Sequence, residues 1–235
     1  MISSAFQIRA QKPFSGMYSL VASYTYSRTL DFGEFGTPTD QFNTRLDYGP
    51  ADFNRAHTLT IAHTLNLPFG PGRRYLSGTT GFARALLGGW QFSGITTYGS
   101  GLPFSPSLSN NASLNSDMSL RPDQNGNPTA NVNQDRNQWI NPAVFAVPAA
   151  FQFGNASRNS IIGPNVFVAN WALDKTFKIA ETTQIQFRWE VYNAFNRTNL
   201  GQPNNAVDTE QAGLITDINS AYPMRNMQWG VHITW

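Results

Sequence analysis

Apolar and polar residues alternate along seven segments of this chain. A period of two residues is the pattern of a β-strand with one apolar face. In the last nine residues, MQWGVHITW, apolar positions alternate with small or polar ones. The same pattern predicts strands over residues 2–11, 17–28, 57–67, 89–99, 166–179, 184–195 and 227–235. The chain is therefore expected to be all-β.

The connections between these segments alternate in length. Short or compact connections are 13–16, 68–88 and 180–183, whereas long polar ones are 29–56, 100–165 and 196–223. A transmembrane β-barrel has this asymmetry, because its short turns face the periplasm and its long loops face outward. We therefore expect an antiparallel transmembrane β-barrel segment, with the three long connections as extracellular loops and the C-terminus at the periplasmic rim.

The aromatic residues and the strand lengths agree with a bilayer. Tilted strands of about ten residues span the hydrocarbon. Aromatics are expected in girdles near strand ends, and they occur there at Tyr24, Tyr26, Trp90, Tyr98, Phe177, Trp229 and Trp235. Lys175 is an exception, because it lies on the apolar face of its strand; near the periplasmic end it is expected to extend its amine to the membrane interface.

An odd number of strands leaves three interpretations open. Bacterial barrels have even strand counts, and seven strands would leave two unpaired edges. Either an eighth strand lies within 100–165, or the chain is part of a larger barrel, or it is a soluble β-sandwich. The N-terminus, MISSAFQIRAQK, lacks the basic start and apolar core of a signal peptide, which favours a part of a larger barrel.

Composition excludes several classes of function. The chain has no cysteine, so it can form no disulfide, thiolate zinc site or cysteine nucleophile. Charged residues are 13% of the chain and the net charge is +2, with Arg73-Arg74 the only basic doublet. Nucleic-acid binding is therefore not expected. No apolar run approaches the ~18 residues of a transmembrane helix.

Four stretches carry a family resemblance. DFNRAHTLTIAHTLNLPFGPGRR, LLGGWQFSGITTYGSGLPFSP, FGNASRNSIIGP and DKTFKIAETTQIQFRWEVYNAFNRTNLGQP resemble the barrel of Oar-like TonB-dependent outer-membrane receptors. The resemblance implies that residues 1–235 are the last seven strands of a 22-stranded barrel, forming an open curved sheet in isolation. It also implies a plug domain and the rest of the barrel as partners, which this sequence lacks. We therefore expect a receptor fragment that does not transport alone, and the sequence indicates no substrate.

The resemblance gives a role to the C-terminal strand. Its alternation and terminal aromatic are similar to the signal read by the machinery that inserts outer-membrane barrels. Outer-membrane lipid and this assembly machinery are thus expected partners. Trp235 stands where phenylalanine is more usual. The residues of this assembly strand are Met227, Trp229, Val231, Ile233 and Trp235.

Four charged residues on the 166–195 hairpin are expected to point into the barrel lumen: Asp174, Lys178, Arg188 and Glu190. A three-residue turn places Asp174 opposite Arg188 or Glu190. Arg188 is favoured, because like charges directly opposite each other are destabilising. The group is either a structural charge ladder or a lumen surface that contacts a plug or a passing ligand.

No catalytic, cofactor or metal site is predicted. His57 and His63 lie about 20 Å apart on one strand, and His232 is expected in the lumen. An outer-membrane enzyme would need a Ser/His/acid set, and none is evident. The 81–89 segment, GFARALLGG, is either an irregular turn or a short helix covering the barrel base with Phe82, Ala85 and Leu86. Loop aromatics that could bind sugars or peptides, or cover the barrel mouth, are Trp139, Phe145, Phe151 and Phe153.

Overall fold

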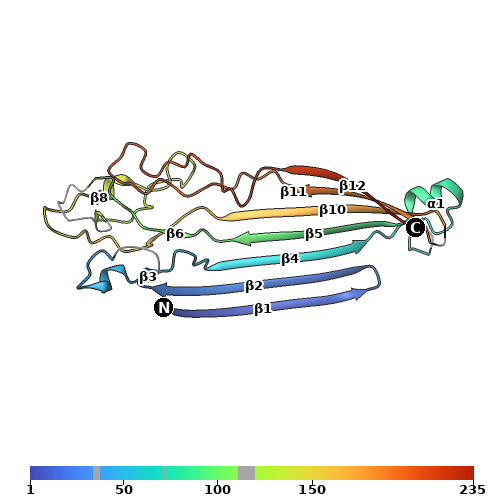
Figure 1. Cartoon of the computed structure of the whole chain (residues 1–235), viewed down its shortest axis with the longest axis horizontal. Coiled ribbons are helices and arrows are strands. Elements are labelled where there is room, and N and C mark those ends of the chain that lie inside the picture. Colours follow the sequence, from blue (N-terminus) through green and yellow to red (C-terminus); the bar gives the residue numbers. More distant parts are fainter. Residues whose placement is uncertain (34–37, 71, 111–119, 181) are drawn as a thin grey trace.

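Seven long strands form one antiparallel sheet (Figure 1). The structure is a computed structural model that describes residues 1–33, 38–70, 72–110, 120–180 and 182–235. Neighbours in the sheet follow chain order, and all seven predicted strands are confirmed. They are β1 (Ile2–Ser15), β2 (Tyr18–Asp31), β4 (His57–Asn66), β5 (Trp90–Gly99), β10 (Val166–Lys178), β11 (Gln184–Tyr192) and β12 (Asn226–Thr234).

The first hairpin is longer than the alternation indicates. β1 and β2 each run for 14 residues, so the turn predicted at 13–16 is wrong, as is the start of the first long loop at residue 29. The strands are joined instead through Gly16 and Met17, with Gly16 at φ +68°. A two-residue hairpin turn commonly needs such a positive φ, which glycine adopts without strain. Pro13 and Phe14 therefore continue the strand.

The strand register separates an apolar face from a polar face. Tyr24 lies opposite both Ile8 and Leu59, and Leu173 lies opposite both Phe92 and Trp189. Because side chains alternate along each strand, these matched positions put apolar side chains on one side of the whole sheet. Polar rows occupy the other side.

Within the part of the chain that the structure describes, no second sheet covers the apolar face. Trp229 is 77% exposed and Phe6 is 59% exposed. The soluble β-sandwich interpretation requires these faces to form a common core, and it is wrong for this chain. Among the described residues, the other sheets are only β6 (Pro103–Phe104) with β9 (Ile161–Ile162), and β7 (Asp123–Gln124) with β8 (Phe145–Ala146).

The long sheet is open. β1 and β12 are its two ends, and neither pairs with the other. The described parts of 100–165 contain only two-residue strands, β6 to β9, whereas a membrane-spanning strand needs about 9–11 residues. These parts therefore hold no eighth spanning strand. The expected open, all-β antiparallel sheet is confirmed.

The long loops gather at one end of the sheet, and the C-terminus lies at the other end with α1 (Gly81–Leu87) (Figure 1). The loop end also contains β3 (Gly49–Pro50) and the 3-10 helices η1 (Thr44–Asp47) and η2 (Pro142–Val144). The loops enclose a small hydrophobic core formed by Phe104, Leu108, Ile140, Ile161 and Val207. Loop 100–165 and loop 196–223 are thus packed together.

Of the two alternatives left open for 81–89, the structure has the short helix and not the irregular turn, but the helix does not take its expected position. Phe82 and Leu86 are 82% and 48% exposed, so they do not cover the barrel base. The reason is a contact at the helix end: the indole Nε1 of Trp90 donates to the carbonyl of Leu86 at 2.9 Å. Because Trp90 is on the apolar face, α1 lies outside the sheet. No helix in the described ranges is long and apolar enough to cross a membrane.

Candidate functional site

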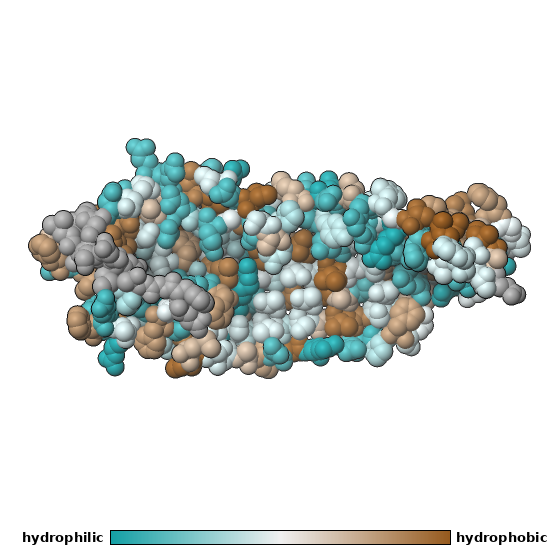
Figure 2. All heavy atoms as spheres, in the orientation of Figure 1, coloured by the Kyte–Doolittle hydropathy of each residue, from teal (hydrophilic) through white to brown (hydrophobic). Residues whose placement is uncertain are grey.

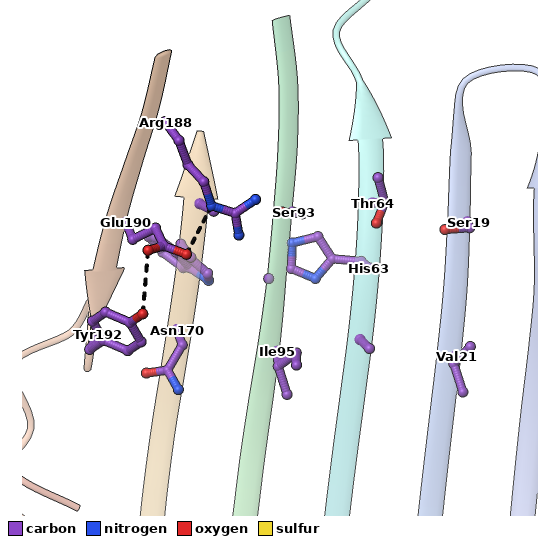
Figure 3. Close-up of a pocket in the computed structure, with 14 residues that line it drawn as sticks. Ser19, Val21, His63, Thr64, Ser93, Ile95, Asn170, Arg188, Glu190 and Tyr192 are labelled. Atoms are coloured by element: carbon purple, nitrogen blue, oxygen red, sulfur yellow. Dashed lines mark hydrogen bonds and ion pairs between the residues drawn. The ribbon is translucent and has the colours of Figure 1, made fainter. Parts of the chain in front are cut away.

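A hollow of about 430 Å³ lies on the polar face (Figure 3). Side chains of β2, β4, β5, β10 and β11 line it. Its floor is made of small residues, among them Ser19, Thr64 and Ser93, while Arg188 and Glu190 form one side. The hollow thus lies across five neighbouring strands of the polar face.

Arg188 links two carboxylates beside this hollow. The β10–β11 register places Asp174 opposite Arg188, so the predicted pairing with arginine is confirmed. Arg188 Nη1 lies 3.4 Å from Asp174 Oδ1, and Arg188 Nε donates to Glu190 Oε1 at 2.9 Å. The Asp174 carboxylate is buried, so the guanidinium compensates a charge that has lost most of its water.

Lys178 is the fourth predicted charge and lies apart from the other three. It is at the end of β10, opposite Gln184. None of the ion pairs formed within the described ranges includes it. The structure therefore brings together Asp174, Arg188 and Glu190 only.

Three polar residues that the sequence reading missed complete the network. Gln186 Nε2 donates to Asp174 at 3.1 Å. Gln228 of β12 donates to Glu190 and, at 3.2 Å, to the hydroxyl of Tyr192. The signal for Gln228 was its polar position in the alternating last strand, but its partner follows only from the register that places it opposite Glu190.

The predicted assembly strand forms one exposed edge of the sheet. Met227, Trp229, Val231 and Ile233 lie opposite the apolar positions of β11, from Val191 to Ile185. Trp229 stacks on Trp189, with ring centroids 5.4 Å apart. Trp235 follows the strand and is 88% exposed. The whole row thus presents aromatic and aliphatic surface outward.

His63 belongs to an aromatic cluster around Gly94 on the apolar face. Its ring centroid is 5.2 Å from that of Phe92. Trp171 occupies the space above Gly94, where an added Cβ would meet the indole Cδ1 at 2.7 Å. Such packing over a strand glycine fills a gap in the face.

The other two histidines are far from this cluster in the sheet. His57 Nδ1 is hydrogen-bonded to the Tyr24 hydroxyl at 2.8 Å, and His232 lies opposite Gln186. The described parts of the chain contain no group of three or more His, Cys, Asp or Glu side chains placed to hold a metal ion.

Lys175 corrects the expectation that its amine reaches the interface. It is 3% exposed. Its Nζ donates to the carbonyl of Gly88 and lies 4.7 Å from the centroid of the Phe177 ring. The 68–88 connection folds over the apolar face at this point, so a carbonyl and an aromatic ring satisfy the ammonium group locally.

Buried ion pairs join the first two long loops. Arg121 lies 3.2 Å from Asp47 and donates to the carbonyl of Leu46 at 2.7 Å. Asp47 also accepts from the amide and hydroxyl of Thr39. Burial lowers the pKa of Arg121 although the Asp47 carboxylate opposes this effect.

The stretch FGNASRNSIIGP supplies a second set of links between these loops. Arg158 pairs with Asp31 and, at 2.8 Å, with Asp52. The neighbouring Asn159 donates to Asp52 at 2.6 Å and to the carbonyl of Pro50 at 2.7 Å. One short segment thereby holds the loop 29–56 against the loop 100–165.

The third loop is tied to the second through Asp208. Its carboxylate accepts from the amide and the hydroxyl of Ser109, both at 2.8 Å. Burial raises the pKa of Asp208, but these hydrogen bonds outweigh it and hold the pKa below its ordinary value.

The four loop aromatics divide into two pairs. Trp139 and Phe145 pack against the loop core, and Trp139 also donates to the carbonyl of Ile162 at 2.8 Å. Phe151 and Phe153 are exposed. The first pair is partly buried and has a packing role, and the second pair offers the larger exposed surface to a ligand.

Comparison with known proteins gives one match. A protein-family model described as an outer membrane beta barrel domain matches residues 4–228, a range that includes at least part of each long strand. Searches of curated proteins and of solved structures found no significant match.

Proposed function

The chain belongs to the outer membrane β-barrel domain family, and we propose that it is the C-terminal part of the barrel wall of a TonB-dependent receptor. Membership of this family places the protein in the outer membrane. The proposal concerns the kind of barrel and the part of it that these strands form.

The observation that carries the proposal is an open sheet with membrane-spanning strands at both edges. Each backbone polar group left unpaired in lipid costs several kcal/mol, so a membrane sheet must close on itself. The strands β1 and β12 therefore need neighbours beyond these 235 residues. Seven strands are about a third of the 22-stranded barrel that the resemblance implies.

The two faces of the sheet support this arrangement. The exposed apolar rows fit lipid, and the polar face with its hollow fits a lumen. In a receptor, the lumen side would contact a plug domain, and the hollow beside Arg188 and Glu190 lies where that contact is expected. The C-terminal strand would carry the assembly signal, with Trp229 and Trp235 on its lipid side.

We also propose a structural and transport role rather than catalysis. The three histidines occupy separate parts of the sheet: His63 packs against Phe92, His57 is hydrogen-bonded to Tyr24, and His232 lies opposite Gln186. The packed extracellular loops would form part of the outer mouth of the receptor, and the exposed Phe151 and Phe153 are the aromatic surface offered to a ligand.

The experiment is to determine the size of the protein that contains these strands. An antibody to the loop peptide 121–138 is applied to outer-membrane fractions of cells that carry the gene. The proposal predicts a band far above the 26.0 kDa of this chain, which is retained by immobilised C-terminal domain of TonB. A 26 kDa membrane protein that TonB does not retain would overturn it.

A further inference from the structure

A second hollow, of about 520 Å³, lies at the short-turn end of the sheet. It is between the 68–88 connection with Gly89 and the end of β10. Three cationic residues line it: Arg73, Arg84 and Lys178. No acidic side chain lines it among the described residues. It is thus a basic site. None of its residues belongs to the network of Asp174, Arg188 and Glu190.

These cations have no carboxylate partner within the described ranges. The ion pairs found there are formed by Arg121, Arg158 and Arg188. Glu181 lies outside the described residues. Three positive groups around one hollow repel one another. An anion within the hollow would attract all three and offset that repulsion.

The hollow lies at the end of β10, where Phe177 and Ile179 of its lining belong to the apolar face and Thr176 and Lys178 to the polar face. Trp90 and Lys175 both belong to the apolar face. Trp90 donates to the carbonyl of Leu86 and Lys175 to the carbonyl of Gly88, both in the 68–88 connection. The connection therefore wraps around the outside of the sheet. In an outer-membrane barrel, this end is at the periplasmic interface.

Apolar side chains surround the cations. Phe69, Phe82, Leu86 and Ile179 are all exposed, and Figure 2 shows apolar side chains gathered at the end of the molecule that carries α1. In water this exposure would be unfavourable, whereas at a membrane interface such side chains enter the acyl region while arginine and lysine reach the headgroups.

We infer that this hollow binds the phosphate headgroup of an anionic glycerophospholipid in the periplasmic leaflet. Cations supply charge-assisted hydrogen bonds to phosphate, and the apolar rim supplies contacts for acyl chains. Free phosphate would use the cations alone, and the rim therefore favours the lipid. The assignment to the periplasmic leaflet rests on the proposed function. The class of ligand rests only on the cations and the apolar rim.

The test measures lipid binding by the full-length outer-membrane protein that contains these strands, extracted into dodecyl maltoside micelles, using native mass spectrometry. Phosphatidylglycerol is compared with phosphatidylcholine of the same acyl chains. We expect one saturable phosphatidylglycerol per chain. The triple variant Arg73→Gln, Arg84→Gln, Lys178→Gln should bind it about 100-fold more weakly, since each cation near a headgroup contributes a factor of about five.

A matched control removes the same charge at the opposite end. The variant Arg28→Gln, Arg45→Gln, Arg225→Gln changes three exposed cations near or within the long loops and should bind phosphatidylglycerol as the unchanged chain does. Circular dichroism checks the fold of each variant. Should the triple variant unfold, Arg84→Gln should still weaken binding and Arg84→Lys should largely restore it.

Three results would overturn the inference: equal binding of the two lipids, equal loss in the control variant, or displacement of the lipid by an equal concentration of inorganic phosphate. The proposed function is tested separately, by the size of the native protein and its retention by TonB. The protein could be a large barrel retained by TonB and show no headgroup selectivity, or show headgroup selectivity without being such a barrel. The two tests therefore fail independently.

Discussion

At the scale of single residues, glycines on the strands distinguish a packed position from an open one. A Cβ added at Gly94 would come within 2.9 Å of the Asn170 carbonyl oxygen and 2.7 Å of Trp171, whereas a Cβ at Gly230 would have nothing within 4 Å. Both residues occupy spanning strands, so they test whether close approach or strand propensity decides the effect of a substitution.

We predict that Gly94→Ala lowers the free energy of unfolding by about 2 kcal/mol, because the Asn170 carbonyl is backbone and cannot turn aside. Gly230→Ala should be neutral or stabilise by about 0.5 kcal/mol, since alanine loses less conformational freedom than glycine on folding. Urea unfolding in micelles, followed by tryptophan fluorescence, gives both values. Equal effects at the two sites would contradict the close approach of Asn170 and Trp171 to Gly94.

The charge network on the polar face makes a second prediction. A double-mutant cycle with Asp174→Asn and Arg188→Gln should give a coupling energy of about 0.5 kcal/mol, because the Arg188 side chain is 47% exposed and water screens the pair. The coupling should shrink in 1 M salt. A cycle between Asp174 and Lys178 is the control, and a coupling of equal size there would contradict the observed pairing.

Asp208 gives a prediction of pH dependence. Its hydrogen bonds lower its pKa in the folded loop, so protonation favours the open loop. The stabilisation is therefore complete above the ordinary aspartate pKa of about 3.9 and is lost as the pH falls through the lower folded value. Amide hydrogen exchange at Ser109 should show faster opening below about pH 4.

The variant Asp208→Asn should remove most of this acid dependence, because its side chain does not titrate. Asp217→Asn is the matched control, since Asp217 is on the same loop but its carboxylate makes no described contact with Ser109. If the acid dependence were unchanged in Asp208→Asn, the link between the second and third loops would not be the titrating contact.

At the scale of elements, the strands were predictable and the packing of the connections was not. Alternation located β4, β5 and β10 closely, because each has one apolar face with a strict period. It did not show where the first hairpin turns, since Pro13 and Phe14 resemble turn residues. The loop core around Ile140 and Ile161 has no periodic signal, because contacts between distant segments create it.

The candidate sites follow the same division. The pairing of Asp174 with Arg188 could be predicted from a short hairpin, whose register its own turn limits to a few choices. The position of Lys175 could not, because the group that covers it, Gly88, is far away in the sequence and is brought there by the fold of the 68–88 connection. Gln228 was missed for a similar reason.

The last strand carries a prediction about assembly. Trp235 is exposed beyond the end of β12, and the resemblance gives a terminal aromatic a role in recognition. We expect Trp235→Ala to reduce assembly into proteoliposomes that contain the barrel-assembly machinery several-fold, and Trp235→Phe to retain it. Phe82→Ala, which removes another exposed aromatic at the same end, is the control. Equal assembly of all variants would remove this role from Trp235.

At the scale of the whole molecule, one sheet separates two environments. Its apolar face and its polar face agree with lipid outside and a lumen inside. The long loops pack into a cap at one end, and a basic hollow lies at the other end. The two unpaired edges make this arrangement incomplete within the chain, so its stability in a membrane depends on neighbouring strands.

The most direct measurement of this claim is the identity of the strands beside β1 and β12 in the protein extracted from outer membranes, determined by cryo-electron microscopy. We predict that two different strands, both outside these 235 residues, pair with these edges within one large barrel. A closed barrel in which β1 pairs directly with β12 would contradict the account.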